Sequence, residues 1–546
     1  MFCNQAFKLD PKMNYLDTAT QIIKDAIKSA IFIDENALPF YSGASVIPID
    51  EEVLSQDLYR NFKSEGISLA IHKYEVGDEN KDALSEYLYE GRDLVLIDWK
   101  LTGEYGEELS LKMISDIVKN DHIHFCVVYT KESKEGLERV FKNILSYFSG
   151  KDSDYYQDLK EQIEIIEGID EIKSDLDFIS LNRDNKEAGK RIGLLSRKNP
   201  AIVQSIIQYS EEPVKKCALI KASIALSDTH KSQNKNSCPT LVSAENQTIV
   251  IENTIITLLN KSENRPDVLL NRLSQQIASS EASFTQLLGL EMKTILSKNS
   301  SFIDSNMLGI SKDAFLYHRN HYRQEGQEHL FSEFVKDVLL ENISLQLRNK
   351  KLQLLDPDFL NSFGDDFHVK DEELISMNVF YNSHQLGIQK KLNFGDVFVG
   401  QEGARYYICI TALCDCLRPK EKIDNNFFFA IGTNISKADA LKLGDTAFVS
   451  FLNSSTIVKW TEFNSRIGNR ERGFSPIYIK PVQFKVLNHE FDNAGEIEIS
   501  LISGDGEITH EKIKYITTIK NSYSQRIANH AFSHPLRVGV DFVKKH

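Results

Sequence analysis

The chain has 546 residues, so we expect about three domains. With 64 basic and 78 acidic side chains its net charge is −14, so we expect no broad nucleic-acid-binding surface. No apolar run is long enough to span a membrane, which favours a soluble protein without a membrane partner. Seven scattered cysteines suit a reducing compartment better than a disulfide framework, so we expect a cytoplasmic protein.

The first part of the chain alternates between apolar β-type runs and segments with helical spacing. After a helix at 17–29, the order is a strand at 30–33, a helix at 51–64, strands at 67–74 and 94–97, a helix at 107–118 and a strand at 123–129. Alternation of this kind predicts an α/β domain built on a doubly wound parallel sheet.

Polar side chains follow three of these strands. Asp34 and Glu35 come after the first strand, Asp98 after the third and Thr130 after the fourth. Because the carboxyl ends of parallel strands meet at one edge of a sheet, where α/β proteins bind ligands, we expect these side chains to converge. The alternative is an ordinary α/β domain whose strands happen to end in polar residues.

This layout, carried by IFIDEN, LVLIDWKL and CVVYTKES, resembles the receiver domain of bacterial response regulators. The resemblance implies a flavodoxin-like fold in which Asp98 is the phosphoacceptor and Thr130 contacts the phosphoryl group. It also implies that Asp34 and Glu35, with Asp98 itself, hold Mg²⁺. A hard divalent cation takes oxygen ligands and offsets the repulsion between clustered carboxylates and an incoming phosphoryl group.

A receiver also has a lysine after its fifth strand, and here the best match lies far downstream. Two β-rich runs, at 248–251 and 254–259, are followed by Asn260 and Lys261, and a helix then opens at Pro266. We therefore assign Lys261 to the phosphoryl-contacting lysine and interpret 131–244 as a helical insertion. Ser262 stands where receivers carry a proline, which is a departure from the family pattern.

The rest of the chain divides into a helical connector and a β-rich region, so the predicted domains are 1–283, 284–377 and 378–546. In the connector, His318, His321 and Tyr322 favour helix packing or a partner surface over a metal site. The last region has short β-type runs separated by Gly-Asp turns, which predict an all-β barrel or sandwich.

The segment FGDVFVGQEGARYYICITALCDCLRP, which opens the β-rich region, resembles the start of the small barrel of the MazF and PemK ribonuclease toxins. Arg405 and Thr411 are the positions that would carry over. Four arginines form the candidate output surface of this region: Arg405, Arg466, Arg470 and Arg472. No catalytic residue is assigned, because no histidine lies near either basic segment in the sequence.

Taken together, the motifs favour a signalling protein, a phosphoacceptor and not an enzyme, whose receiver passes a signal from Asp98 to the β-rich domain. In outline the chain resembles the response-receiver proteins that bacteria encode beside histidine-kinase-like (GHKL) ATPases in phage-defence operons. That resemblance implies such an ATPase, or another protein, as partner, with Mg²⁺ as cofactor, and it leaves a homo-oligomer open. Two alternatives remain: an effector ribonuclease, and a scaffold with an unphosphorylated receiver.

Overall fold

The computed structural model describes most of the chain, with gaps mainly in loops and at both ends. The described residues are 11–39, 50–78, 82–101, 106–120, 124–227, 238–279, 283–303, 305–324, 328–364, 367–384, 391–401, 403, 405–443, 448–461, 479, 481–502 and 508–532. The chain divides into two compact units, one made of Met1–Tyr317 and Phe334–Gly364, the other of His318–Glu333 and Asp365–His546.

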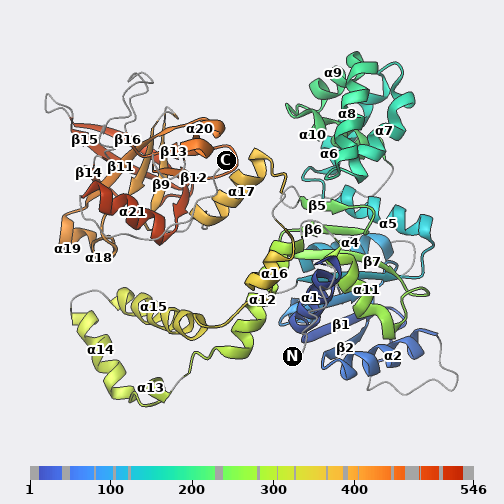
Figure 1. The fold of residues 1–546 in the computed structure, drawn as a ribbon, viewed down its shortest axis with the longest axis horizontal. Helices are drawn as coiled ribbons and strands as arrows, with labels where there is room; N and C mark the ends of the chain where they lie inside the picture. Colours follow the sequence, from blue (N-terminus) through green and yellow to red (C-terminus); the bar gives the residue numbers. More distant parts are fainter. Residues whose placement is uncertain are drawn as a thin grey trace, which may run out of the picture. The chain divides into compact units, whose positions relative to one another are not determined.

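The first unit is built on a seven-stranded sheet (Figure 1). Its parallel strands are β1 (Ser29–Asp34), β2 (Ser68–Lys73), β3 (Leu94–Ile97), β4 (Phe125–Thr130) and β7 (Thr254–Asn260), in the order β2-β1-β3-β4-β7. The hairpin strands β6 (Thr248–Ile251) and β5 (Pro239–Ser243) extend the sheet in antiparallel fashion beyond β7. With β7 as the fifth parallel strand, this is the flavodoxin-like strand order, and the predicted α/β class is confirmed.

Helices cover both faces of the sheet, so its strands are buried on both sides. One apolar core lies under α1 (Pro11–Ala26), α2 (Asp50–Ser64), α11 (Pro266–Ala278) and α12 (Ser283–Asn299). The other lies under α3 (Asp82–Tyr89), α4 (Gly106–Val118) and α5 (Lys134–Tyr147). The expected element order left out α3, because a helix of eight residues offers only two turns of periodic pattern.

Within the predicted insertion 131–244, five helices form a bundle with its own core. They are α6 (Ser153–Glu164), α7 (Ile169–Leu181), α8 (Lys186–Lys198), α9 (Pro200–Tyr209) and α10 (Lys215–Ala225). The segment's first helix, α5, packs instead on the sheet through Val140, Phe141 and Ile144. The bundle therefore interrupts a receiver-like domain between its fifth helix and its fifth parallel strand.

The helical middle of the chain begins with α12, which packs against α1. It continues through α13 (Ser305–Leu308), α14 (Lys312–Gln324), α15 (Glu328–Leu347), the 3₁₀ turn η2 (Gln353–Leu355), α16 (Pro357–Asn361) and α17 (Asp371–Asn382). The buried carboxylate of Glu291 in α12 accepts hydrogen bonds from the backbone N–H groups of Gln353 and Leu354, at 2.5 and 3.2 Å. This contact ties η2 to α12, the first helix of the helical middle.

The C-terminal region is a barrel and not an open sandwich. Six antiparallel strands close a ring: β9 (Asp396–Gly400), β10 (Tyr406–Cys409), β11 (Asn426–Asn434), β14 (Pro481–Val486), β15 (Glu496–Ile502) and β16 (Ile508–Ile519). The pairing of β10 with both β9 and β11 completes the closure. Further elements are β8 (Ser383–His384), β12 (Val449–Phe451), β13 (Ile457–Lys459), α18 (Leu413–Leu417), α19 (Pro419–Ile423), α20 (Lys437–Leu443) and α21 (Asn521–Ala531).

The predicted turn at Gly395 has a steric requirement in this barrel. Gly395 has φ of +85°, and a Cβ there would lie 2.7 Å from the carbonyl oxygen of Ile519. The next residue, Asp396, is fully buried and accepts a hydrogen bond from the Thr518 hydroxyl at 2.7 Å. The Gly-Asp pair therefore joins β9 to β16 and has a structural role.

Candidate functional site

Three strand ends bring charged side chains together at the carboxyl edge of the parallel sheet. Asp34 is the last residue of β1, Asp98 follows β3, and Lys261 follows β7. The backbone N–H of Asp98 donates to the carbonyl of Ile33 at 3.0 Å, and the N–H of Lys261 donates to that of Thr130 at 2.7 Å. The sheet ladder thus continues into the site and sets the positions of these residues.

The Lys261 ammonium contacts both carboxylates. Its Nζ donates to Asp34 Oδ2 at 2.7 Å and lies 3.2 Å from Asp98 Oδ1. The side chains of Asp34, Lys261 and Asp98 are 1, 4 and 17% exposed. A charge buried this far needs a paired partner, and Lys261 is that partner for both acids across 163 and 227 residues of chain. The juxtaposition expected from strand ends is therefore present, while the chemical roles of these residues stay predictions.

Two carboxylates share one ammonium, and this leaves Asp98 in an unfavourable environment for its charged form. The pKa of Asp98 is raised from 3.8 to about 6, because burial and, to a smaller extent, the neighbouring Asp34 carboxylate raise it by more than the contact with Lys261 lowers it. Both carboxylates also accept a hydrogen bond from a backbone N–H group, Asp34 Oδ1 from Asn36 at 2.7 Å and Asp98 from Trp99. The charge of Asp98 therefore changes at a pH closer to neutrality than the charge of an ordinary aspartate does.

We expect any phosphoryl transfer to Asp98 to slow as the pH falls through about 6. The carboxylate is the nucleophile, and with the pKa raised to about 6 the ionised fraction drops about tenfold for each pH unit below that value. Initial rates of labelling by a small phosphodonor, measured from about pH 4.5 to about pH 8, would test this. A rate that stays constant down to about pH 4.5 would contradict the raised pKa.

The other two predicted site residues lie nearby but make different contacts. Thr130 ends β4, is buried, and stands in register beside Asn260, while its Oγ1 accepts a 3.4 Å hydrogen bond from the N–H of Glu132. Glu35 is half-buried and accepts a hydrogen bond from the Asn36 side-chain amide at 3.2 Å. Lys261 thus contacts Asp34 and Asp98, and Glu35 contacts the side chain of its neighbour Asn36.

Asp34, Glu35 and Asp98 are the carboxylates expected to hold Mg²⁺. Within the described residues, no three acidic, histidine or cysteine side chains form a group that could hold a metal ion. Mg²⁺, however, is commonly bound through only one or two carboxylates, with water and phosphate oxygens completing an octahedron. Asp34 and Asp98 fit that smaller requirement, and the expected third ligand, Glu35, is not part of a preformed set.

A network of polar contacts at the rim of the site was missed in the sequence. Lys100 Nζ lies 2.7 Å from Glu132 Oε1, so an ion pair connects the segment after Asp98 with the segment after Thr130. The side-chain amide of Asn260 donates to the Glu132 carbonyl at 2.6 Å, and its Oδ1 accepts from the N–H of Ser262 at 2.7 Å. An asparagine directly after a strand is a turn-forming signal that could have identified this residue.

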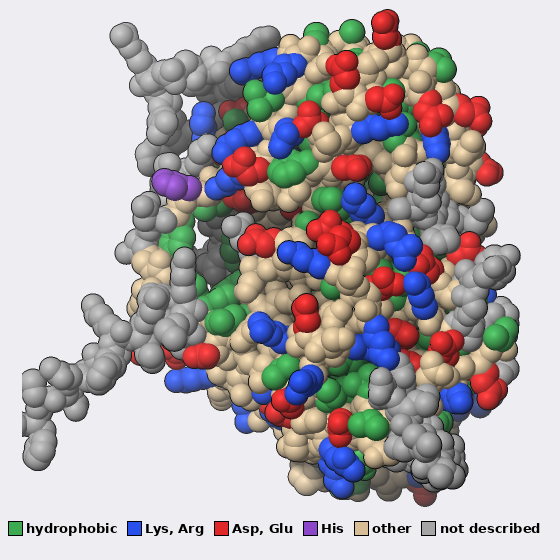
Figure 2. All heavy atoms as spheres, turned by 90° about the vertical axis from the view of Figure 1, so that its right-hand side faces the viewer, with side chains coloured by type: hydrophobic (Ala, Val, Ile, Leu, Met, Phe, Trp, Pro, Cys, Tyr) green, Lys and Arg blue, Asp and Glu red, His purple; other side chains and the backbone are tan. Residues whose placement is uncertain are grey.

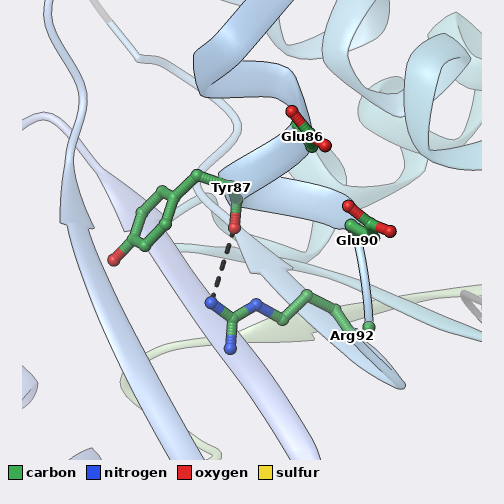
Figure 3. A pocket seen from close by; sticks show the side chains of 5 residues that line it. Glu86, Tyr87, Glu90 and Arg92 are labelled. Carbon is green, nitrogen blue, oxygen red and sulfur yellow. Dashed lines mark hydrogen bonds between the residues drawn. The ribbon is translucent and has the colours of Figure 1, made fainter.

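A surface pocket on the same unit lies at the other end of β3. It is lined by Glu86, Tyr87, Glu90, Gly91 and Arg92 (Figure 3). The Arg92 guanidinium donates to the Tyr87 carbonyl at 3.4 Å and to the Ser29 hydroxyl at 3.0 Å. Arg92 precedes β3 whereas Asp98 follows it, so this pocket takes no part in the carboxylate site.

The candidate output arginines are only partly within the described residues. Arg405 is exposed, next to the start of β10. Arg466, Arg470 and Arg472 lie outside the described residues. Thr411, the other position suggested by the toxin resemblance, is buried and exchanges hydrogen bonds with the backbone of Phe428, at 2.7 and 3.3 Å, so its hydroxyl is used to hold the barrel together.

Comparison with known families agrees with the fold and the geometry of the site. Residues 26–188 match the family model described as response receiver domain, so the chain carries a divergent response receiver domain, as the strand-end motifs predicted. The match includes Asp34, Asp98 and Thr130 and ends within α8, before β7 and Lys261. No curated protein and no solved structure matches the chain.

Proposed function

We propose that this chain is a receiver-type signalling protein in which Asp98 accepts a phosphoryl group and the β-barrel serves as output. The observation that carries the proposal is the Lys261 ammonium, buried in contact with Asp34 and Asp98. A purely structural pair needs one carboxylate for one ammonium. The second carboxylate on this ammonium, Asp98, has a raised pKa, and perturbed pKa values cluster at functional sites.

The proposed step is a transfer of one phosphoryl group. A carboxylate oxygen of Asp98 attacks the phosphorus of the donor, the bond from phosphorus to the leaving oxygen breaks, and an acyl phosphate forms on Asp98. The phosphoryl group brings close to two negative charges, which Lys261 would neutralise while the Thr130 hydroxyl donates to a phosphoryl oxygen. Asp34 and Asp98, with Glu35 directly or through water, would hold Mg²⁺, which would offset the charge of the phosphoryl oxygens.

The direct test is to incubate the protein with acetyl phosphate and Mg²⁺. We expect a mass increase of one phosphoryl group, mapped to Asp98 after reductive trapping of the acyl phosphate. The same reaction with EDTA in place of Mg²⁺ should give little product. An unmodified protein under conditions that label a control receiver would refute the proposal.

One observation favours a second candidate, a scaffold whose receiver is never phosphorylated. The described residues hold no preformed three-ligand metal site, and Lys261 already neutralises part of the charge between Asp34 and Asp98. In that case Mg²⁺ would not bind at millimolar concentration. A titration with Mg²⁺ separates the two candidates. Its readout is the fluorescence of Trp99, which is adjacent to Asp98, in a Trp460→Phe variant that has no other tryptophan. Only the phosphoacceptor requires Mg²⁺ to bind and change this fluorescence.

For the partner, we propose a histidine-kinase-like (GHKL) ATPase in the cytoplasm, within an antiphage defence system. The support is the receiver domain itself, since a phosphoacceptor needs a donor. The six described cysteines are also free, which suits a reducing compartment. None of the described helices is long and apolar enough to cross a membrane. Transfer of labelled phosphate from an ATPase encoded beside this chain, abolished by Asp98→Asn, would test the pairing.

We expect the whole protein to have no ribonuclease activity, so that the barrel acts through protein contacts. RNA cleavage needs a base and an electrostatic stabiliser at one phosphate, whereas Thr411 is occupied by the barrel backbone. Figure 2 shows the side of the receiver unit and its helical bundle, where basic and acidic side chains are interspersed and form no extended basic patch for RNA. Incubation with labelled RNA, beside an Arg405→Ala variant, is the measurement. Cleavage that this substitution abolishes would make the toxin-like function the leading one.

A further inference from the structure

The helix α7 docks the bundle α6–α10 onto the receiver sheet and onto α5. Asp177 Oδ2 of α7 lies 3.5 Å from Lys142 Nζ of α5. Asp184, just beyond α7, accepts a hydrogen bond from the backbone N–H of Val242 in β5 at 2.9 Å. Leu181, the last residue of α7, packs against the apolar core under α3, α4 and α5. The bundle therefore touches both α5 and the hairpin strand β5, next to which it lies in Figure 1.

The contact between α5 and the bundle can shift at little cost. Lys142 and Asp177 are 39 and 49% exposed, and an ion pair between exposed side chains contributes little to stability. The bundle also has an apolar core of its own, separate from the two cores of the receiver sheet. Parts of a chain with separate cores and a small, polar contact move relative to each other by default. The position of the bundle therefore depends on the position of α5.

Glu132 connects the first turn of α5 with the carboxylate site. Its Oε1 lies 2.7 Å from Lys100 Nζ, and Lys100 stands two residues after Asp98. Its backbone N–H donates to the Thr130 hydroxyl at 3.4 Å. A Cβ on Gly136, in the first turn of α5, would overlap Glu132 Oε2, so the carboxylate rests against the helix where a glycine leaves room for it. The same side chain thus contacts the edge of the site and the start of α5.

A second cation, Arg139 of α5, also faces Glu132. Its Nη2 lies 3.9 Å from Glu132 Oε1 and 2.8 Å from Glu107 Oε1 in α4. The side-chain amide of Asn143, one turn further along α5, donates to Glu107 Oε2 at 3.2 Å. Glu132 therefore stands between Lys100, which is beside the site, and Arg139, which is part of α5. If Lys100 leaves, the contact with Arg139 is still available, so the carboxylate would follow α5.

We infer that a phosphoryl group on Asp98 competes with Glu132 for Lys100, and that this exchange repositions α5 and the helical bundle docked on it. The inference rests on the proposed phosphorylation of Asp98. Lys100 is 56% exposed, so its side chain can change partners at little cost. The phosphoryl group brings close to two negative charges against one on Glu132, and its oxygens form strong charge-assisted hydrogen bonds. The same charge repels the Glu132 carboxylate, which then turns toward Arg139.

The bundle is in this way an element of the chain that responds to phosphorylation, with Lys100 and Glu132 as positioning residues. A bound group shifts an equilibrium only through an interaction that differs between the two states. Here that interaction is the partner of Lys100, which is Glu132 in the unphosphorylated chain and the phosphoryl group in the phosphorylated chain. Because α5 is one continuous helix, a displacement of its first turn also moves Lys142 and with it the docking contact of α7.

Hydrogen exchange of the full-length chain, read by mass spectrometry with and without acetyl phosphate and Mg²⁺, tests the inference. We expect peptides from α5 and from α7 around Asp177 to exchange at least about fivefold faster after phosphorylation, which is the lower end of usual coupling strengths. The intact mass of the same samples reports the labelling. Labelled protein with unchanged exchange in both helices would overturn the inference alone. Protein that stays unlabelled would refute the proposed function, and the inference with it.

Variants of the ion pair separate this coupling from a purely structural role. Glu132→Gln and Lys100→Met each remove the pair, so α5 should exchange faster before phosphorylation, and labelling should add little. Lys100→Arg keeps the charge and should retain the phosphorylation-dependent change. The matched control is Lys160→Met, which removes an ion pair with Glu164 within α6 and should show the full change. If Glu132→Gln or Lys100→Met is labelled and keeps the full change, Lys100 does not connect the site with α5 and the inference is wrong.

Discussion

Asp98→Asn is expected to abolish phosphoryl labelling by acetyl phosphate, with a loss of at least about 100-fold in rate, because an amide is a far weaker nucleophile than a carboxylate. The substitution should not unfold the domain. Burial and Asp34 both raise the pKa of Asp98, so its charge is unfavourable in the folded state and a neutral isostere relieves that cost. The measurement is intact-mass spectrometry over a time course, with the thermal midpoint recorded for the same samples.

The control for this prediction is Asp116→Asn, which removes another carboxylate of the same domain. Asp116 is in the last turn of α4 and pairs with Lys119 just beyond the helix. It should be labelled at the wild-type rate. If Asp98→Asn were labelled as fast as wild type, the phosphate would be on another residue and the assignment of Asp98 would be wrong.

Lys261→Met is expected to lower the free energy of unfolding of the receiver unit by roughly 3–5 kcal/mol near pH 8, because it leaves two buried carboxylates without their shared cation. The loss should be smaller near pH 5. Without Lys261 the pKa of Asp98 rises further, so the folded state binds a proton that the unfolded state has released. Stability therefore falls as the pH increases. Urea denaturation at several pH values is the measurement.

Mg²⁺ gives a further readout of the same variant. Two carboxylates without a counter-ion attract a divalent cation more strongly, so Mg²⁺ should restore part of the stability lost in Lys261→Met. The matched control is Lys293→Met, which breaks the partly exposed pair with Asp93 and should cost no more than about 1 kcal/mol, with little dependence on pH. An equal loss in both variants would mean that the Lys261 contacts have no special weight.

Much of the receiver-like domain could be predicted because its signals are local. The apolar runs of β1, β3 and β4 are buried on both faces, and such strands are written in the sequence as unbroken β-branched and aliphatic stretches. The polar residue at the end of each run marks the carboxyl edge of the sheet. For this reason Asp34, Asp98 and Lys261 could be named before any distance between them was known.

Other features depend on contacts between distant segments. The choice between barrel and sandwich rests on whether β10 pairs with β11 as well as β9, which alternation within each strand does not specify. The same holds for α5, whose apolar stripe fits either a helical bundle or a sheet. It packs on the sheet because β4, which directly precedes it, is buried there.

The sequence by itself determined the class of the domain and which residue types stand at the edge of its sheet, because both follow from the order of short-range patterns. Only the tertiary structure decided how charge is shared there. Lys261 lies closer to Asp34 than to Asp98, and Glu35, adjacent to Asp34 in the chain, accepts a hydrogen bond from the side-chain amide of Asn36. Successive side chains at a strand end point to different sides, and desolvation depends on everything packed around a carboxylate. The raised pKa of Asp98 is therefore a property of the folded chain and not of its local sequence.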